Sequence, residues 1–182
     1  MTGKHRLPMG AMLALAVIAT IAMTPRVAPQ SADPTDAGKA VFKRANCFGC
    51  HKWHGNGGGG YGGDALSLRK TELAKEQIVE TVSCGRPGTG MPFFTRGAYD
   101  SVKCYDMNRQ DVGAQIPPEA NVFLRKEDAE SVADYVLAHI KGKGEPTYAE
   151  CTDFFGNNSR VCDVHKTGQS SSGAQTSTGQ PK

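Results

Sequence analysis

The chain has 182 residues, of which 38% are hydrophobic and 21% are charged, so its length fits one small domain with extensions. The formal net charge is +3, but Lys4, Arg6 and Arg26 lie near the N-terminus, and without them 18 basic residues face 18 acidic ones. A chain so close to neutral lacks the basic face that nucleic-acid binding requires, which excludes nucleic acid as an expected partner.

The first segment has the three parts of a secretory signal peptide. Basic residues on either side of His5 precede an apolar stretch over residues 9–23. We predict a signal peptide over residues 1–32, cleaved after Ala22 or near Ala32. The apolar stretch is too short to span a bilayer comfortably, and an uncleaved N-terminal anchor is the alternative. The domain is therefore expected in the periplasm.

A short amphipathic helix leads into the most informative motif of the chain. The helix is predicted over residues 37–46, with Asp36 as its N-cap and with Val41 and Phe42 on its inner side. Cys-Phe-Gly-Cys-His follows at residues 47–51, and this spacing is the attachment signature of c-type haem.

The motif assigns a role to three side chains. Cys47 and Cys50 are expected to bind the haem covalently through thioethers, while His51 supplies one axial bond to the iron. A redox dithiol would follow a buried strand, which residues 41–46 do not resemble. A zinc site needs about four ligands, and no second Cys-x-x-Cys or His-x-x-x-His follows. The sequence therefore predicts one covalent haem c per chain.

Glycine dominates residues 55–63, which cannot form helix or strand. No lysine completes a phosphate-binding motif here. The glycines indicate either close backbone approach to the haem edge or to a partner, or a flexible surface loop. A second helix is predicted over residues 71–82, with Thr71 as a cap and Ile78 on its inner side.

Met91 stands in a loop, residues 84–94, that is rich in glycine and proline. Because proline fixes backbone torsions, this loop can hold the Met91 thioether against the haem face opposite His51. Met107 is the reserve candidate for the sixth ligand and His54 is the third. The alternative for Met91 is an ordinary core methionine.

Residues 93–124 show no sustained hydrophobic period and are predicted to form an irregular insertion held by a disulfide, which could cover one haem edge. The carboxylates of Asp106, Asp111 and Glu119 lack the spacing of a calcium loop and are expected to be solvated.

The clearest helix is predicted over residues 126–141, where Val132, Tyr135, Val136 and Ile140 form one apolar stripe. His139 is expected to be an ordinary helix residue and not an iron ligand.

The C-terminal region has a different composition. Residues 143–165 are expected to form a small disulfide-closed loop outside the core, and residues 166–182 a disordered tail of Ser, Thr, Gly and Gln.

Four cysteines remain after the haem motif, an even set for an oxidising compartment: Cys84, Cys104, Cys151 and Cys162. Two disulfides are the simplest outcome. Of the three connectivities, Cys84 with Cys104 and Cys151 with Cys162 closes the shortest loops, and each bond would add about 2–4 kcal/mol. Free or metal-binding thiols are the alternative.

Residues 35–142 resemble the class I c-type cytochromes, because the haem motif, the Gly-Met-Pro loop and the final helix follow one another in that family's order. The resemblance implies a mostly α cytochrome c fold: a small helical domain around one covalently bound haem, here with a disulfide-bonded extension. It also implies His51 and Met91 as axial ligands, and a final helix that crosses the first one. One departure is that the family's Gly-Pro segment, whose proline carbonyl orients the proximal histidine, has no match in residues 55–64.

These features predict a single-electron carrier and not an enzyme, because no catalytic acid, base or open coordination position is evident. By analogy with the family, a periplasmic dehydrogenase such as a quinoprotein would donate electrons, and an oxidase or another cytochrome would accept them. The alternatives are a haem enzyme or gas-binding sensor with an open sixth position, and a subunit fixed within a dehydrogenase complex.

The partner is expected to bind at the exposed haem edge, on an apolar patch with a basic rim. The predicted patch comprises Phe48, Trp53, Phe93 and Phe94. The predicted rim comprises Lys52, Arg86 and Arg96.

Overall fold

The computed structural model describes residues 1, 34–59 and 63–166. The chain divides into two units, residues 1–31 and 32–182, and only the second is described beyond Met1. The predicted signal peptide after Met1 and the predicted tail after Lys166 therefore lie outside the described residues. Within the described ranges, no helix has the length and apolar character needed to cross a bilayer.

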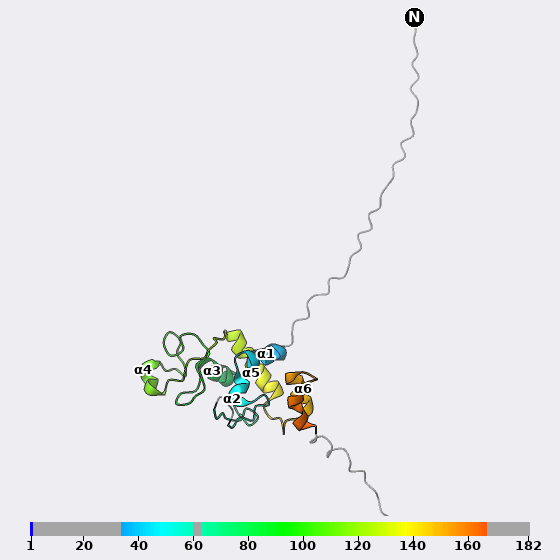
Figure 1. Ribbon diagram of the computed structural model, residues 1–182. Helices are drawn as coiled ribbons and strands as arrows, with labels where there is room; N and C mark the ends of the chain where they lie inside the picture. Colours follow the sequence, from blue (N-terminus) through cyan, green and yellow to red (C-terminus); the bar gives the residue numbers. More distant parts are fainter. Residues whose placement is uncertain (2–33, 60–62, 167–182) are drawn as a thin grey trace, which may run out of the picture. The chain divides into compact units, whose positions relative to one another are not determined.

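The described part of the chain is mostly helical (Figure 1). Its elements are α1 (Pro34–Arg44), α2 (Cys47–His51), α3 (Lys75–Cys84), α4 (Arg109–Val112), the 3-10 helix η1 (Gly113–Gln115), α5 (Lys126–His139), α6 (Tyr148–Phe155) and the 3-10 helix η2 (Arg160–His165). Isolated β-bridges occur, but the residues described here form no β-strand. This content agrees with the predicted mostly α fold class.

Helices α1 and α5 cross at a glycine. A Cβ atom added at Gly38 would overlap the carbonyl oxygen of Ser131 and the side chain of Tyr135, so only glycine allows this close crossing. Nearby, the rings of Phe42 and Tyr135 lie 5.6 Å apart. The first and last helices of the predicted domain therefore pack as the family resemblance implies.

Helix α5 begins at the predicted Lys126 and ends two residues before the predicted Lys141. Its predicted apolar stripe is buried: Val132, Tyr135, Val136 and Ile140. His139 is exposed and stacks on the Tyr135 ring, with 5.2 Å between ring centroids.

Two predicted N-caps are wrong. Helix α1 begins at Pro34, before Asp36, because proline suits the first helical position; Asp36 lies in the first turn, 3.6 Å from the Lys39 ammonium. Helix α3 begins after Ala74, not at Thr71, because the Gln77 side chain accepts a hydrogen bond from the Ala74 N–H at 2.9 Å.

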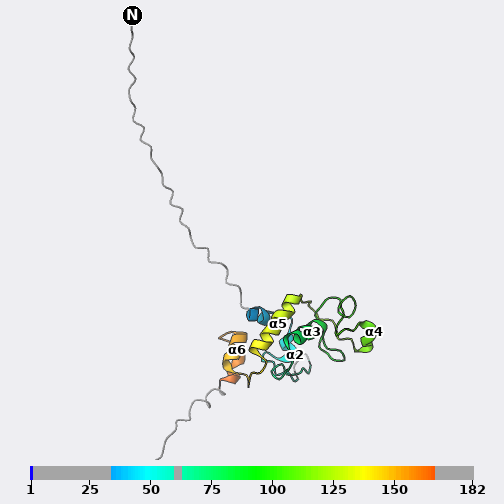
Figure 2. The ribbon, with the colours of Figure 1, turned by 180° about the vertical axis from the view of Figure 1, so that it is seen from behind.

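The insertion over residues 93–124 has its own small core, and the predicted disulfide between Cys84 and Cys104 is confirmed. Asn108 caps α4 by accepting hydrogen bonds from the next helical N–H groups. The Asp111 carboxylate accepts from the Asn108 N–H at 2.9 Å, so it serves the cap and is not merely solvated. Seen from both sides, α4 and α6 lie at opposite ends of this unit (Figures 1 and 2).

The C-terminal extension is helical and joins the main core, which corrects the prediction of a loop outside it. The predicted disulfide between Cys151 and Cys162 is confirmed, and it links α6 to η2. Phe154 of α6 is buried, and its ring lies 6.3 Å from Phe42 and 6.0 Å from Phe48. An aromatic side chain of the extension thus completes the core beside the haem motif.

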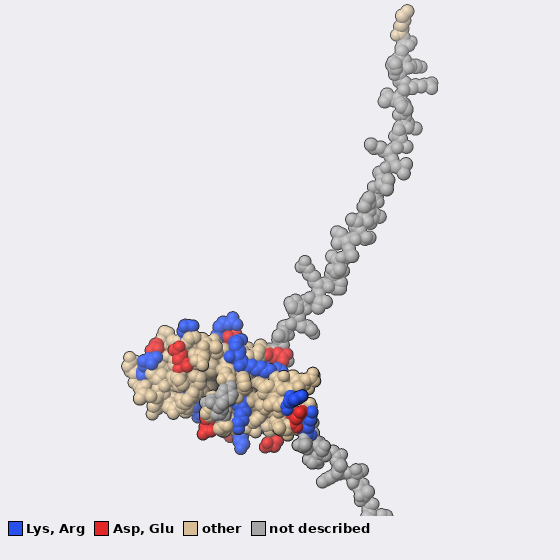
Figure 3. Space-filling model, viewed as in Figure 1, with Lys and Arg blue, Asp and Glu red and all other residues tan. Residues whose placement is uncertain are grey.

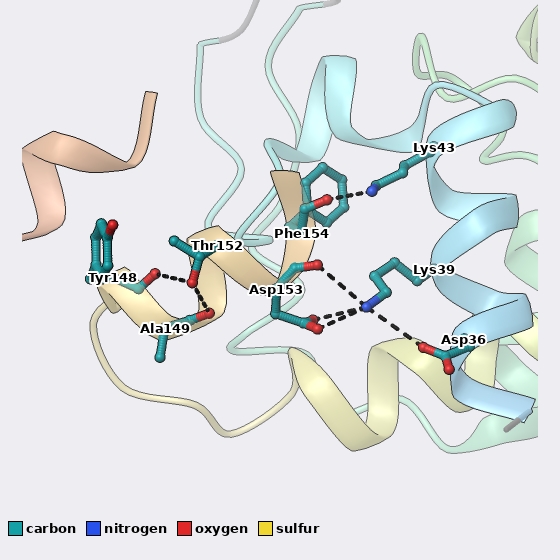
Figure 4. A network of polar contacts seen from close by, with 8 residues as sticks. All are labelled: Asp36, Lys39, Lys43, Tyr148, Ala149, Thr152, Asp153 and Phe154. Atoms are coloured by element: carbon teal, nitrogen blue, oxygen red, sulfur yellow. Dashed lines mark hydrogen bonds and ion pairs between the residues drawn. The ribbon is translucent and has the colours of Figure 1, made fainter. Parts of the chain in front are cut away.

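Polar contacts also hold the extension (Figure 4). Lys39 of α1 donates to the Asp153 carboxylate at 2.9 Å, and Lys43 donates to the Phe154 carbonyl. The buried Arg69 guanidinium donates to the His54 carbonyl at 2.6 Å and to Glu150 at 3.1 Å. Because the Arg69 charge is removed from water, its pairing with Glu150 makes the extension an integral part of the fold.

Candidate functional site

A cavity of about 1010 Å³ lies beside α2, α3 and α5, at the upper end of the usual range for ligand pockets, about 300–1,000 Å³. Three predicted site residues, Cys47, His51 and Met91, line it, as does the reserve candidate Met107. The fold thus brings together residues that lie far apart in sequence. His54, the third candidate, borders a separate and much smaller pocket.

Both apolar and polar side chains line this cavity. The apolar members are Phe42, Leu66, Leu68, Leu73, Ile78, Val82, Pro87, Val132 and Val136. The polar members include Ser67, Lys70, Thr71, Glu72, Gln77, Glu80, Thr81, Arg86 and Tyr105. The apolar side chains suit a large flat apolar ring, and the basic Lys70 and Arg86 suit acidic groups attached to it; a porphyrin has both features.

His51 is held in the orientation that a metal ligand needs. Its Nδ1 lies 3.0 Å from the carbonyl oxygen of Leu66. Because a carbonyl only accepts, Nδ1 carries the hydrogen, which leaves the Nε2 lone pair available. Burial lowers the pKa of His51, so the imidazole is neutral at pH 7. Both features suit coordination of an iron atom.

The Leu66 carbonyl thus contacts His51 although the chain lacks the Gly-Pro segment of the resembled family, and no side chain in the sequence indicates this contact. Backbone hydrogen bonds fix this segment: Gly58 N–H donates to the Ala65 carbonyl at 2.8 Å, and Leu68 N–H donates to the Gly55 carbonyl at 2.7 Å. At Gly57, φ is +66° and a Cβ atom would overlap the Ala65 carbonyl oxygen. The close backbone approach predicted for the glycines is thus made to the chain itself.

The two cysteines of the motif lie on the single turn of α2. Residues with left-handed torsions flank this turn, Asn46 with φ 56° and Lys52 with φ 61°. Cys47 and Cys50 belong to neither disulfide. Burial raises the pKa of the Cys47 thiol to about 12, whereas a redox dithiol requires a lowered pKa.

Met91 is half-buried and is positioned by its backbone. Its carbonyl accepts a hydrogen bond from the Arg86 N–H at 3.2 Å, and its N–H donates to the Thr89 hydroxyl at 3.2 Å. A Cβ atom added at Gly85 would lie 2.7 Å from the Met91 carbonyl oxygen, so these two backbone segments are in direct contact. Met107, also half-buried, reaches the same cavity from the insertion.

The predicted apolar docking patch is wrong. Phe93 and Phe94 are buried, at 5% and 6% exposure, and they belong to different core clusters. They are buried because a later segment, residues 118–124, pairs with them. The Phe93 N–H donates to the Pro118 carbonyl at 3.0 Å, and the Leu124 N–H donates to the Phe94 carbonyl at 2.9 Å. Phe48 and Trp53, the other two members, are half-buried and pack around Phe154.

Two residues of the predicted basic rim make contacts of their own. Arg96 lies over the Phe123 ring, 4.2 Å from its centroid, whereas Arg86 lines the cavity and Lys52 follows the haem motif. On the face shown in Figure 3, basic and acidic side chains are interspersed. Within the described residues, no group of three or more His, Cys, Asp or Glu side chains is placed to hold a metal ion.

Comparison with known proteins adds one match. The family model for cytochrome C oxidase, cbb3-type, subunit III, matches residues 33–107, a range that includes the Cys-x-x-Cys-His motif, Met91 and Met107. This match indicates a c-type cytochrome domain, which implies haem c binding and supports a haem-based electron carrier. Neither a curated protein nor a solved structure matched the chain.

Proposed function

We propose that this chain, with its c-type cytochrome domain, is a class I monohaem cytochrome that carries single electrons in the periplasm. Cys47 and Cys50 would bind one haem covalently, and His51 and Met91 would be its axial ligands. One observation carries the proposal: His51 is held by the Leu66 carbonyl with Nε2 available, on the wall of a cavity that Met91 also lines.

Haem, when bound, supplies a one-electron iron couple. The chain's own residues prepare the site for it. The Leu66 carbonyl fixes the His51 ring and raises the basicity of its Nε2. Apolar side chains such as Val82 and Val136 line the cavity and would shield a bound ring from water. Because backbone contacts fix both ligands in place, electron transfer requires little rearrangement, and thioether ligation favours a high reduction potential.

The proposed compartment follows from the N-terminal segment and the disulfides. The signal peptide predicted over residues 1–32 and two disulfides favour an oxidising compartment, which in a bacterium is the periplasm. We propose a periplasmic dehydrogenase, such as a quinoprotein, as the electron donor and an oxidase or another cytochrome as the acceptor. The matched family is described as an oxidase subunit, which favours an oxidase as the acceptor.

The test is the absorption spectrum of the oxidised protein, produced in a host that matures c-type cytochromes. An iron–methionine bond gives a weak red absorption band, which we expect in the wild type and in Met107→Ala but not in Met91→Ala. Loss of the band in Met107→Ala instead would assign the sixth ligand to Met107. A high-spin wild-type spectrum that shifts with carbon monoxide would favour a haem enzyme or gas sensor.

A further inference from the structure

Two tyrosines of the insertion hold the end of α3. The Tyr99 hydroxyl donates to the Cys84 carbonyl at 2.9 Å, and the Tyr105 hydroxyl donates to the Gly85 carbonyl at 2.7 Å. Carbonyls at the C-terminus of a helix lack partners within the helix, so these hydroxyls satisfy groups that would otherwise need water. The Met91 loop begins at this point.

Tyr105 occupies a backbone position that tyrosine seldom takes. Cys104 and Met107 exchange backbone hydrogen bonds at 3.1 and 2.9 Å across a two-residue turn, and φ is 54° at Tyr105 and 60° at Asp106. Such turns favour Asn-Gly, because positive φ is unfavourable for side chains with a Cβ atom. Unfavourable torsions of this kind persist where the surroundings fix them, and they gather at functional sites.

The Tyr105 side chain explains this choice of residue. Its ring lines the cavity, and its hydroxyl fixes the Gly85 peptide. The Gly85 peptide in turn lies against the Met91 backbone, because a Cβ atom added at Gly85 would be 2.7 Å from the Met91 carbonyl oxygen and from the Phe93 nitrogen. A displacement of the Gly85 backbone would therefore also displace the Met91 backbone.

The contacts around Tyr105 leave it little freedom to move. Its N–H donates to the Glu80 carboxylate of α3 at 3.2 Å, and its hydroxyl donates to Gly85, the residue that caps the C-terminus of α3. The preceding residue, Cys104, is fully buried and is bonded to Cys84 at the end of the same helix. The turn that carries Tyr105 is thus fixed to α3 at three points.

We propose that Tyr105 is the positioning residue for Met91, acting through Gly85, so that the insertion determines how firmly the sixth ligand is held. This inference rests on the proposed function, because it has a chemical consequence only if Met91 binds iron. The proposal gives Tyr105 no bond to the iron; its hydroxyl donates to the Gly85 carbonyl.

The test compares Tyr105→Phe with the wild type in the oxidised holoprotein. Phenylalanine keeps the ring in the cavity wall and removes the hydrogen bond to Gly85. Added imidazole competes with methionine for the iron, so a loosened Met91 raises the apparent imidazole affinity. Loss of one hydrogen bond predicts a rise of about threefold to tenfold, together with a lower reduction potential.

Two further variants separate positioning from general stability. Tyr148→Phe removes a hydroxyl from a half-buried tyrosine on α6, at the far end of the unit, and should leave imidazole affinity unchanged. Tyr99→Phe should raise the affinity less than Tyr105→Phe, because its carbonyl partner Cys84 lies one residue further than Gly85 from Met91 along the chain. A merely structural role predicts the opposite order, since Tyr99 is the more deeply buried tyrosine.

The outcomes are distinct. If Tyr105→Phe binds imidazole as the wild type does, while Met91→Ala abolishes the red absorption band, the positioning role is overturned and the proposed function stands. If Tyr99→Phe produces the larger change in imidazole affinity, the positioning role is likewise overturned. If the wild type has no iron–methionine band, the proposed function fails and the role of Tyr105 fails with it.

Discussion

Two sets of residues at the cavity hold the proposed ligands by different means. The His51 wall consists of His51, residues 55–58 and Leu66; the Met91 wall consists of Gly85, Met91 and Tyr105. In the His51 wall, the contact of His51 Nδ1 and the backbone hydrogen bonds join residues 15 or fewer positions apart along the chain. In the Met91 wall, the loop is held from the insertion, through a hydroxyl and a disulfide.

The difference has a physical consequence for ligand exchange. Short-range contacts close small loops and lose little when a distant part of the chain loosens. The Met91 wall depends on contacts made by the insertion, so a local opening there frees the ligand while His51 stays in place. We therefore expect perturbations of the insertion to affect Met91 selectively.

The largest effect is expected from replacing the ligands themselves. His51→Ala removes the ligand on the side where the haem is attached, and we expect holoprotein yield to fall by at least about tenfold. Met91→Ala should keep the haem and leave the sixth position open. Haem staining of denaturing gels measures both yields; equal losses would contradict the proposed difference between the walls.

A matched pair of glycine variants tests each wall separately. Gly57→Ala and Gly85→Ala both place a Cβ atom at φ +66° and against backbone atoms. Left-handed strain and overpacking should together lower the free energy of unfolding by about 2–5 kcal/mol in each case.

The spectra of these two variants should differ although their stabilities are similar. Gly57→Ala displaces the segment that ends at Leu66, so the His51 ring signals in nuclear magnetic resonance should shift. Gly85→Ala should weaken the iron–methionine band. Chemical denaturation gives the stabilities, and a methionine band lost in Gly57→Ala but kept in Gly85→Ala would reverse the assignment.

The two disulfides provide a second matched pair. They join cysteines 20 and 11 residues apart, so replacing either pair with alanine should cost about 2–4 kcal/mol of unfolding free energy. Only Cys84→Ala with Cys104→Ala should also raise imidazole affinity, because only that bond supports the Met91 wall. An equal rise after removal of Cys151 and Cys162 would show that the effect comes from stability alone.

The smallest effect is expected at the extension's surface. Asp153→Asn removes the ion pair between Asp153 and Lys39. The Asp153 side chain is 57% exposed. Exposed pairs contribute about 1 kcal/mol or less, so the variant should unfold almost as the wild type does and keep its spectrum. Thermal unfolding measures this, and a spectral change would extend the site to α6.

The haem motif and the two disulfides show what could be predicted from the sequence. The motif at residues 47–51 carries its chemistry in side chains at fixed spacing, and the shortest loops gave both cysteine pairings. The group that contacts His51 Nδ1 could not be predicted from the sequence, because the Leu66 carbonyl belongs to the backbone and any residue would supply it.

Long-range packing explains why the remaining predictions from the sequence were wrong or incomplete. Phe93 and Phe94 stand in a loop by composition, but a chain segment more than 20 residues later covers them. Phe154 belongs to an extension with no counterpart in the resembled family, and nothing local indicates that its ring enters the core. Tyr105 could have been noticed only as the neighbour of Cys104, once the disulfide had placed it beside α3.

The most direct test of the central claim is mass spectrometry of the secreted protein after digestion with trypsin, which releases residues 45–52 as one peptide because Arg44 and Lys52 are its cleavage sites. The account predicts that this peptide carries the mass of one haem. An unmodified peptide, or one with Cys47 and Cys50 joined in a disulfide, would contradict it.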